Sequence, residues 1–327
     1  KAVRGKIHAD KEAEKAIISL TLPDEIKTVT IPINTENTVF TLPINGLQTG
    51  KYPLDGNVYG KDGKLLKTFR KQIRKLPPAP FEYIGQPKRY FTINGKPFFP
   101  IVQWGVISHD AANYYHAARH GINVTFFYAD DAVTALKQFD LASKYGIRIF
   151  LYLSGPVNAQ QMPQFKEKMK KLLTQDVRNH PAFMGYYLFD EPLWVGVPAE
   201  PLQAAYEFLK ELDPYHPVWI TAAPRNEIVD LKPYAAACDI FGCDIYPVPV
   251  PNTHSGLDDK TLTCTGKYAA RMNRIADFRK PIWQALQGFA WHEASSNPLD
   301  RSAQPYPTLR ESRFMAYDSM VNGATGY

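Results

Sequence analysis

The nine residues from Met184 to Pro192, MGYYLFDEP, are the stretch that most constrains how this chain can fold. An apolar and aromatic run leads directly into two adjacent carboxylates, and a proline follows them. A parallel strand covered on both faces is apolar along its length, and proline, which lacks an N–H, ends the sheet pairing. The stretch therefore predicts a buried strand with Asp190 and Glu191 at its carboxyl end. The alternative is a strand end whose two carboxylates only solvate a loop.

The first 87 residues have a different pattern, in which short alternating segments are separated by turn dipeptides such as Asn45-Gly46 and Asp62-Gly63. Short strands at this spacing are typical of a small antiparallel, Ig-like β-sandwich. A proline-rich segment at residues 76–80 predicts a stiff linker to the next unit. We therefore expect a β-sandwich domain over residues 1–87, with strands at 15–22, 26–33, 38–44, 52–59 and 65–73.

From residue 90 onwards, strand-like runs alternate with helical ones, which predicts parallel strands joined by crossover helices. We expect residues 88–327 to form a (β/α)8 TIM barrel. Residues 324–327 would begin its eighth strand, so the barrel is incomplete at its C-terminus. We therefore expect the natural protein to continue past Tyr327. A hairpin at Asn94-Gly95 precedes the first barrel strand. The other predicted strands are 98–104, 123–128, 147–153, 217–221, 239–246 and 281–289, and the predicted helices are 111–120, 132–145, 162–178, 201–212, 263–276 and 308–322.

The positive charge of the chain is concentrated outside the predicted barrel. Residues 1–97 hold 17 Lys and Arg against 9 Asp and Glu, whereas the remainder holds 21 against 23. Seven of these cations lie in residues 61–75. They favour the solvated face of an edge strand over a nucleic-acid or polyanion site, so no nucleic-acid partner is expected.

Other features of the sequence indicate the cellular location of the protein and exclude further classes of protein. No apolar run approaches the roughly 20 residues of a membrane helix, and the first residue is Lys, which favours a processed start and a secreted or periplasmic protein. Asn123-Val-Thr125 matches a glycosylation sequon by chance, because it begins an apolar strand. Three cysteines, Cys238, Cys243 and Cys264, lack metal-ligand spacing. Buried thiols are expected, with a Cys243–Cys264 bridge as the alternative.

Because the carboxyl ends of parallel barrel strands meet at one rim, polar and aromatic residues at these ends predict a single bowl. Carboxylates surrounded by aromatic rings suit a sugar, whose C–H faces stack on rings while its hydroxyls bond to carboxylates and amides. The candidate catalytic residues are Glu191, Asp190 and Asp244. The candidate substrate-binding residues are Gln103, Trp104, Tyr128, Tyr152, Tyr246, Gln287, Trp291 and Glu293.

Three segments carry a resemblance to a known group: FTINGKPFFP at 91–100, GYYLFDEP at 185–192 and KPIW at 280–283. They resemble the clan of retaining (β/α)8-barrel glycoside hydrolases, particularly members with a β-sandwich before the barrel. This resemblance implies a glycosidase acting on a poly- or oligosaccharide without cofactor or metal. It implies that Glu191 is the acid/base residue, which protonates the glycosidic oxygen and then activates water.

Two positions depart from the pattern of this clan. Asp190 replaces the usual asparagine, and the end of the seventh strand carries Leu286 and Gln287 instead of a nucleophilic glutamate. Asp244 could supply the nucleophile or base, the substrate's own 2-acetamido group could attack with Asp190 orienting it, or Glu293 could swing in from its loop. Alternatively, the chain is a carbohydrate-binding pseudoenzyme that has lost its nucleophile. A metal-dependent hydrolase would have to use the pairs His292-Glu293 and His109-Asp110.

Overall fold

The computed structural model describes residues 2–78, 84–85, 89–104, 109–294 and 305–327. The chain divides into two compact units, residues 1–79 and residues 80–327. Residues 79 and 80 of the predicted linker, and the predicted domain boundary at residue 87, lie outside the described residues.

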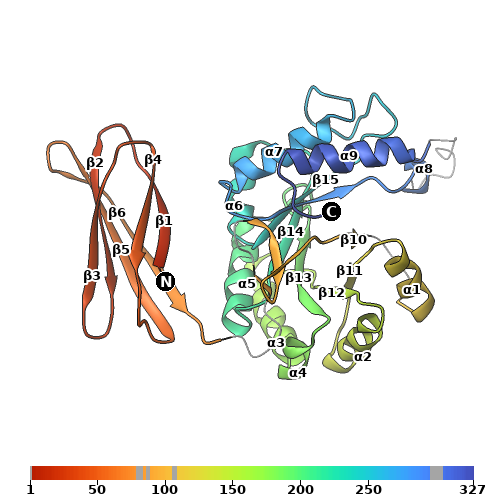
Figure 1. Ribbon diagram of the computed structural model, residues 1–327, viewed down its shortest axis with the longest axis horizontal. Coiled ribbons are helices and arrows are strands. Elements are labelled where there is room, and N and C mark those ends of the chain that lie inside the picture. The colour runs from red at the N-terminus through yellow and green to blue at the C-terminus, as the bar shows by residue number, and fades with distance from the viewer. Residues whose placement is uncertain (1, 79–83, 86–88, 105–108, 295–304) are drawn as a thin grey trace. The chain divides into compact units, whose positions relative to one another are not determined.

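The first unit contains two antiparallel sheets (Figure 1). Burial alternates along β2 and β5, so each strand turns one face toward a shared core of residues such as Ile18, Leu20 and Leu54. The first strand, β1, was not among the predicted segments. One sheet pairs β1 (Ala2–His8) with β4 (Asn37–Pro43), and the other has the order β3 (Ile26–Pro32), β2 (Ala13–Thr21), β5 (Gly50–Gly60), β6 (Leu65–Lys75).

The lysine- and arginine-rich segment forms β6, the edge strand of its sheet. Most of its side chains are exposed, and Arg70 donates to Asp55 on the neighbouring strand with an Nε–Oδ1 distance of 2.6 Å. Cations on an edge strand oppose pairing with a second sheet. The predicted edge position and exposure of this segment are confirmed.

The second unit is built on a seven-stranded parallel sheet that curls into a barrel-like surface, with helices on its outside (Figure 1). The strands follow chain order and each pairs with the next. They are β10 (Val102–Gln103), β11 (Val124–Phe127), β12 (Arg148–Tyr152), β13 (Phe183–Asp190), β14 (Val218–Ala222), β15 (Ile240–Ile245) and β16 (Ile282–Leu286).

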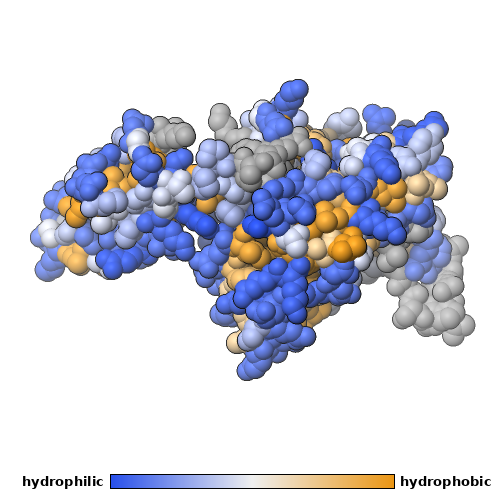
Figure 2. Space-filling view, turned by 90° about the horizontal axis from the view of Figure 1, so that it is seen from below, coloured by the Kyte–Doolittle hydropathy of each residue, from blue (hydrophilic) through white to orange (hydrophobic). Residues whose placement is uncertain are grey.

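The helices alternate with these strands, as the sequence pattern predicts. None of the described helices has the length and apolar character that crossing a bilayer requires. On the face seen in Figure 2, hydrophilic side chains predominate and hydrophobic ones show between them, as expected for amphipathic helices. The helices are α1 (Ala111–Arg119), α2 (Ala132–Ser143), α3 (Met162–Leu172), α4 (Gln175–Asn179), α5 (Ala199–Leu212), α6 (Ile228–Ala235), α7 (Cys264–Ile275), α8 (Trp291–Ala294) and α9 (Leu309–Val321).

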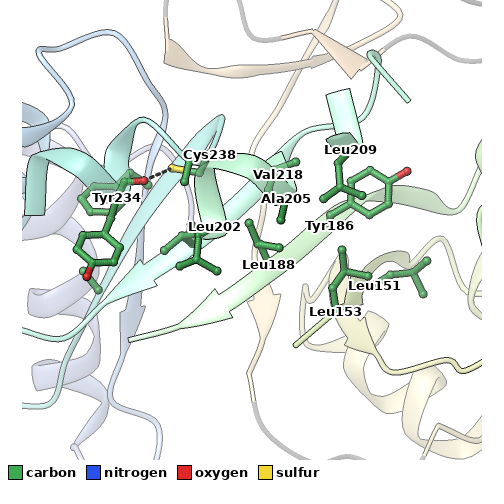
Figure 3. Packing of buried hydrophobic residues seen from close by; sticks show 14 of the residues in the cluster. Leu151, Leu153, Tyr186, Leu188, Leu202, Ala205, Leu209, Val218, Tyr234 and Cys238 are labelled. Atoms are coloured by element: carbon green, nitrogen blue, oxygen red, sulfur yellow. Dashed lines mark hydrogen bonds between the residues drawn. The ribbon is translucent and has the colours of Figure 1, made fainter. Parts of the chain in front are cut away.

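Two hydrophobic clusters lie on the two faces of the parallel sheet. The outer cluster joins the strands to the helices; Figure 3 shows Leu188 of β13 beside Leu202 of α5, and Tyr186 of β13 beside Leu209. The inner cluster fills the interior of the curled sheet with large side chains. Its buried members are Phe91, Val124, Phe150, Met184, Tyr187, Trp219, Ile240 and Trp283.

Two short segments accompany the parallel sheet, and one of them joins its edges. The predicted hairpin is confirmed: β8 (Phe91–Ile93) and β9 (Lys96–Phe98) are joined by Asn94 and Gly95, both with positive φ, as a tight hairpin turn requires. Residues 325–327 hydrogen-bond to β16 on one side and to residues 100–102 on the other. These bonds link β10 and β16, the two edge strands of the parallel sheet, through residues 325–327. A short strand β7 (Ile84–Gly85) pairs with β8.

The predicted helix over residues 162–178 is wrong in one respect, because the structure divides it into α3 and α4. Leu173 leaves the helical region with ψ 58°, and the Thr174 hydroxyl accepts from the Val177 N–H at 3.4 Å, which caps a new helix. Helix α6 was not predicted, since it is short and contains Pro233. The cysteine prediction is confirmed: Cys238, Cys243 and Cys264 are buried and free.

A methyl group at Gly185 is expected to destabilise the barrel unit. A Cβ built there would lie 2.4 Å from the Pro217 carbonyl oxygen, a backbone atom that cannot turn away. Gly185→Ala should therefore cost about 1–3 kcal/mol of unfolding free energy. Denaturation followed by tryptophan fluorescence reports on this unit alone, because all five tryptophans lie in it.

Gly288→Ala is the matched control, since a Cβ there meets no heavy atom within 4 Å. Equal denaturation midpoints for the two variants would contradict the expected steric conflict at Gly185.

Candidate active site

The end of β13 departs from regular strand geometry where the two adjacent carboxylates lie. Its register against β14 shifts between Tyr187 and Phe189, and Glu191 has a φ of 46°, which is unusual for a residue other than glycine. Neighbouring residues of a regular strand point to opposite faces. The irregular backbone instead lets Asp190 and Glu191 act electrostatically on the same residue, Asp244. Strain of this kind is commonly stored at functional sites.

Glu191 and Asp244, which lies near the end of β15, share a hydrogen bond between their carboxyl groups. Burial raises the pKa of Asp244 well above its ordinary value, and the charges of Glu191 and Asp190 raise it further. Burial and the charge of Asp190 also raise the pKa of Glu191, against the hydrogen bond from Asp244 and the charge of Arg225. Carboxyl groups that interact this strongly titrate as a pair, and their mutual repulsion when both are ionised favours keeping one proton on the pair.

Two carboxylates that flank a sugar lie roughly 5–5.5 Å apart in retaining and roughly 6.5–9.5 Å apart in inverting glycosidases. Asp244, the predicted nucleophile or base, lies near the end of β15, where its carboxyl group interacts with that of Glu191. The Oδ1 atom of Asp244 is buried without a hydrogen-bond partner among the described residues.

Asp190, the third carboxylate, lies beside two tyrosines. The Tyr187 hydroxyl donates to its Oδ1 at 2.6 Å. Burial raises the pKa of Asp190, and this hydrogen bond opposes the shift. The negative charge of Asp190, together with burial, raises the pKa of Tyr152, whose ring lies 5.1 Å from that of Tyr187. Tyr152 is thus placed at the carboxylate cluster.

Trp104 extends this aromatic wall at the end of β10. Its ring meets those of Phe126 and Tyr187 edge-on at 4.8 and 5.0 Å, and about a third of the residue is exposed. Gln103, the residue before it, is half-buried and pairs with Thr125 of β11. The structure thus gives Trp104 a place beside Tyr187, whose hydroxyl holds Asp190.

A second aromatic group lies near Asp244. The rings of Tyr246 and His254 stack at 4.7 Å, and Trp291 lies 5.3 Å from His254. The Nδ1 atom of His254 accepts from the Tyr246 N–H at 3.1 Å, which leaves Nε2 3.7 Å from Asp244. Burial and the charge of Arg225 lower the pKa of His254 to about 4, so its ring is neutral near pH 7.

Gln287 has both ends of its amide bonded to backbone. Its Oε1 accepts from the Val248 N–H at 2.7 Å, and its Nε2 donates to the carbonyls of Val248 at 2.8 Å and Phe289 at 3.0 Å. The residue at the expected nucleophile position therefore ties the loop after β15 to the loop after β16.

The structure does not bring Tyr128 and Glu293 into contact with the three carboxylates through any of the interactions described. Tyr128 donates to Asp130 at 2.7 Å, and Lys168 of α3 donates to its hydroxyl at 2.8 Å. Glu293 is exposed on α8 and accepts a hydrogen bond from Tyr306.

The two His-carboxylate pairs have other surroundings. Asp110 caps α1 by accepting from the Asn113 N–H at 2.9 Å, and His109 packs edge-on against Phe127 at 4.8 Å. Within the described part of the chain, no group of three or more His, Cys, Asp or Glu residues could hold a metal ion. The sequon residue Asn123 bonds through its amide to the backbone of Phe99 and Ile101.

Sequence reasoning missed two residues of the site, His254 and Arg225. His254 lies in the proline-rich loop after β15, and Arg225 lies in the loop after β14, where the guanidinium carbon is 5.0 Å from the ring centroid of Trp194. Arg225 acts electrostatically on both Glu191 and His254. Its position four residues beyond a predicted strand end was the available signal.

No protein-family profile matches the sequence. A comparison with curated proteins finds no match. Solved structures do match, among them a β-D-glucuronidase from Dictyoglomus thermophilum, with 16% identity and a TM-score of 0.52, over 99% of this chain and 58% of that one. A GH2 β-galacturonidase from Eisenbergiella tayi matches with 14% identity and a TM-score of 0.51, over 96% of this chain and 58% of that one. A glycoside hydrolase family 5 mannosidase from Rhizomucor miehei matches with 14% identity and a TM-score of 0.55, over 75% of this chain and 84% of that one.

These likenesses establish the fold of the chain. Glycoside hydrolases of families GH2 and GH5 share its curled parallel sheet, and the GH2 matches extend over nearly the whole chain, including the antiparallel unit. The chain spans 58% of the length of each of the two GH2 structures.

Proposed function

We propose that this protein is a glycoside hydrolase of poly- or oligosaccharides and that Glu191 is its general acid/base. The observation that carries the proposal is the coupled pair of Glu191 and Asp244 at the carboxyl ends of β13 and β15, two strands of one parallel sheet, with aromatic rings beside them. Such a pair keeps a carboxyl protonated at a pH where an isolated one would be ionised. A secreted or periplasmic location belongs to the same proposal.

The proposal includes the finer details of the fold. The second unit is a (β/α)8 barrel whose eighth strand begins at residues 324–327, and the first is an Ig-like sandwich, with the domains divided at residue 87. The bonds from residues 325–327 to both edge strands support the barrel. Catalytic groups of such barrels gather at the carboxyl ends of the strands.

In the proposed mechanism, Glu191 donates its proton to the glycosidic oxygen as the bond breaks. Asp244 holds that proton on the pair before the reaction. Asp190 is fixed by the Tyr187 hydroxyl and orients the nucleophile. If the 2-acetamido group of the substrate attacks, its oxygen bonds to the anomeric carbon as the leaving group departs, and Glu191 then accepts a proton from the water that opens this intermediate. If water attacks directly, Asp190 accepts the proton of that water as the bond to the leaving group breaks.

The test is turnover of a glycoside panel that includes glucuronides, galacturonides, mannosides and 2-acetamido sugars, followed by proton NMR. The configuration of the fresh product gives the stereochemical course. Faster turnover of 2-acetamido substrates than of their 2-hydroxy counterparts would identify the substrate as the nucleophile. Failure to hydrolyse any glycan, across the pH range in which the protein is folded, would refute the proposed activity.

The pH profile should respond to removal of Asp244. The pair loses its shared proton as pH rises through its raised pKa, so activity should fall on the alkaline side. Asp244→Asn leaves Glu191 to titrate without the second carboxylate, and its proton should be lost at a lower pH. We expect the alkaline limb of kcat/KM to move to lower pH, and an unmoved limb would contradict proton sharing.

A second candidate function, a carbohydrate-binding protein without catalysis, is favoured by Gln287. An amide stands at the end of β16 and is held by three backbone hydrogen bonds, so it cannot attack an anomeric carbon. Glycan affinity without turnover in the panel would support this candidate over the hydrolase.

A further inference from the structure

Arg225 lies on a loop whose backbone is fixed on both sides of it. The carbonyl of Pro224 accepts hydrogen bonds from the Gly256 N–H at 3.0 Å and from the Tyr268 hydroxyl at 2.5 Å. The carbonyl of Asn226 accepts from the Arg271 guanidinium. Because both neighbours are anchored, the base of the Arg225 side chain has a defined position beside the carboxylate cluster.

The guanidinium of Arg225 packs on an aromatic ring. It lies over Trp194 at 5.0 Å, and among the residues that the structure describes it makes no hydrogen bond or ion pair. Its charge nevertheless acts on Glu191. A half-buried guanidinium with five N–H donors is an unusual group to leave without an acceptor.

Trp194 offers ring surface beside this cation. The residue is 56% exposed although Arg225 lies over its ring. Exposed tryptophan rings suit the C–H face of a pyranose, and the planar guanidinium fork matches a carboxylate, to which it donates two parallel hydrogen bonds. The two side chains together fit a sugar that carries a carboxylate.

We infer that Arg225 and Trp194 bind an acidic sugar unit, a uronic acid, whose ring lies on Trp194 and whose carboxylate pairs with Arg225. The inference rests on the proposed carbohydrate site and specifies its substrate class. The negative charge of Asp190 repels the carboxylate of the sugar from the rest of the carboxylate cluster. The positive charge of Arg225 attracts that carboxylate, so the two charges together orient the sugar in the site. A neutral sugar would leave the guanidinium donors unpaired.

The test measures binding in the Glu191→Gln protein, so that ligands are not consumed. Calorimetry compares p-nitrophenyl glycosides in pairs that differ only at C6, glucuronide with glucoside and galacturonide with galactoside, in both anomers, and oligogalacturonate with its methyl ester. At least one acidic member should bind about tenfold or more tighter than its neutral partner. Arg225→Met should abolish this preference, and Arg225→Lys should retain part of it.

Arg279→Met is the control, because Arg279 is an exposed arginine of the same unit. Equal affinity for acidic and neutral members, or equal weakening of both by Arg225→Met, would overturn the inference. A 6-O-sulfated sugar that binds while no uronate does would overturn it as well. If the unmodified protein hydrolyses glycosides but shows no preference for acidic sugars in binding, only this inference fails. If acidic sugars bind preferentially but no glycoside is hydrolysed, only the proposed activity fails.

Discussion

Glu191→Gln is expected to lower kcat/KM for an unactivated glycoside by about 10³-fold, within the range attributed to general acid–base catalysis. Glutamine preserves the shape of the side chain but cannot protonate the departing oxygen. The loss should be much smaller for a 2,4-dinitrophenyl glycoside, because that leaving group departs without protonation. This dependence on the leaving group separates proton donation from a loss of substrate binding.

Glu207→Gln is the matched control, since Glu207 is exposed on α5 and undergoes the same chemical change. Its rate should equal that of the unmodified protein. If Glu191→Gln retained full activity, or lost the same factor with both leaving groups, Glu191 would not be the proton donor.

Asp213→Ala is expected to cost about 3–5 kcal/mol of unfolding free energy, because it leaves two buried hydrogen-bonding side chains without their carboxylate. Asp213 and His216 are each 1% exposed. Asp213 accepts from the Tyr186 hydroxyl at 2.6 Å and lies 2.7 Å from the Nδ1 atom of His216. The variant leaves both partners buried without their carboxylate.

The effect of this variant should depend on pH. Burial alone would raise the pKa of Asp213, but attraction to His216 and the hydrogen bonds from His216 and Tyr186 hold it below the ordinary value of 3.8. A carboxyl with a lowered pKa stabilises the fold above its unfolded pKa, and this contribution is lost as pH falls through the folded one. The difference in unfolding free energy between the unmodified protein and Asp213→Ala should therefore become smaller below about pH 4.

Urea denaturation followed by tryptophan fluorescence measures this difference. Asp258→Ala, at an exposed carboxylate, serves as the control and should change stability by less than about 0.5 kcal/mol. A loss at Asp213 no greater than that at Asp258 would mean that the buried network does not hold the barrel.

The periodic parts of the fold could be predicted from sequence because burial dictates their pattern. The apolar run before Asp190 predicted β13, and β16 and α9 followed from equally regular stretches. The break between α3 and α4 depends on one threonine cap within a pattern that remains helical. The short helix α6 has too few turns to show periodicity.

The candidate site was predictable only in part, for a physical reason. Residues at strand ends, such as Asp190 and Asp244, follow from strand position. His254 lies in a loop, and its place against Tyr246 depends on contacts among distant segments. The left-handed backbone of Glu191 likewise has no sequence signature, since glycine and asparagine are the residues that usually adopt it.

The backbone ties of Gln287 limit how this barrel could acquire a different chemistry. A glutamate at that position would supply a carboxylate but could not donate to the carbonyls of Val248 and Phe289, as the amide does. Replacing the amide of Gln287 with a carboxylate would thus release both the loop after β15 and the loop after β16. A carboxylate at the end of β16 would need compensating changes in those loops, so more than one substitution separates this site from one with a nucleophilic glutamate at that strand end.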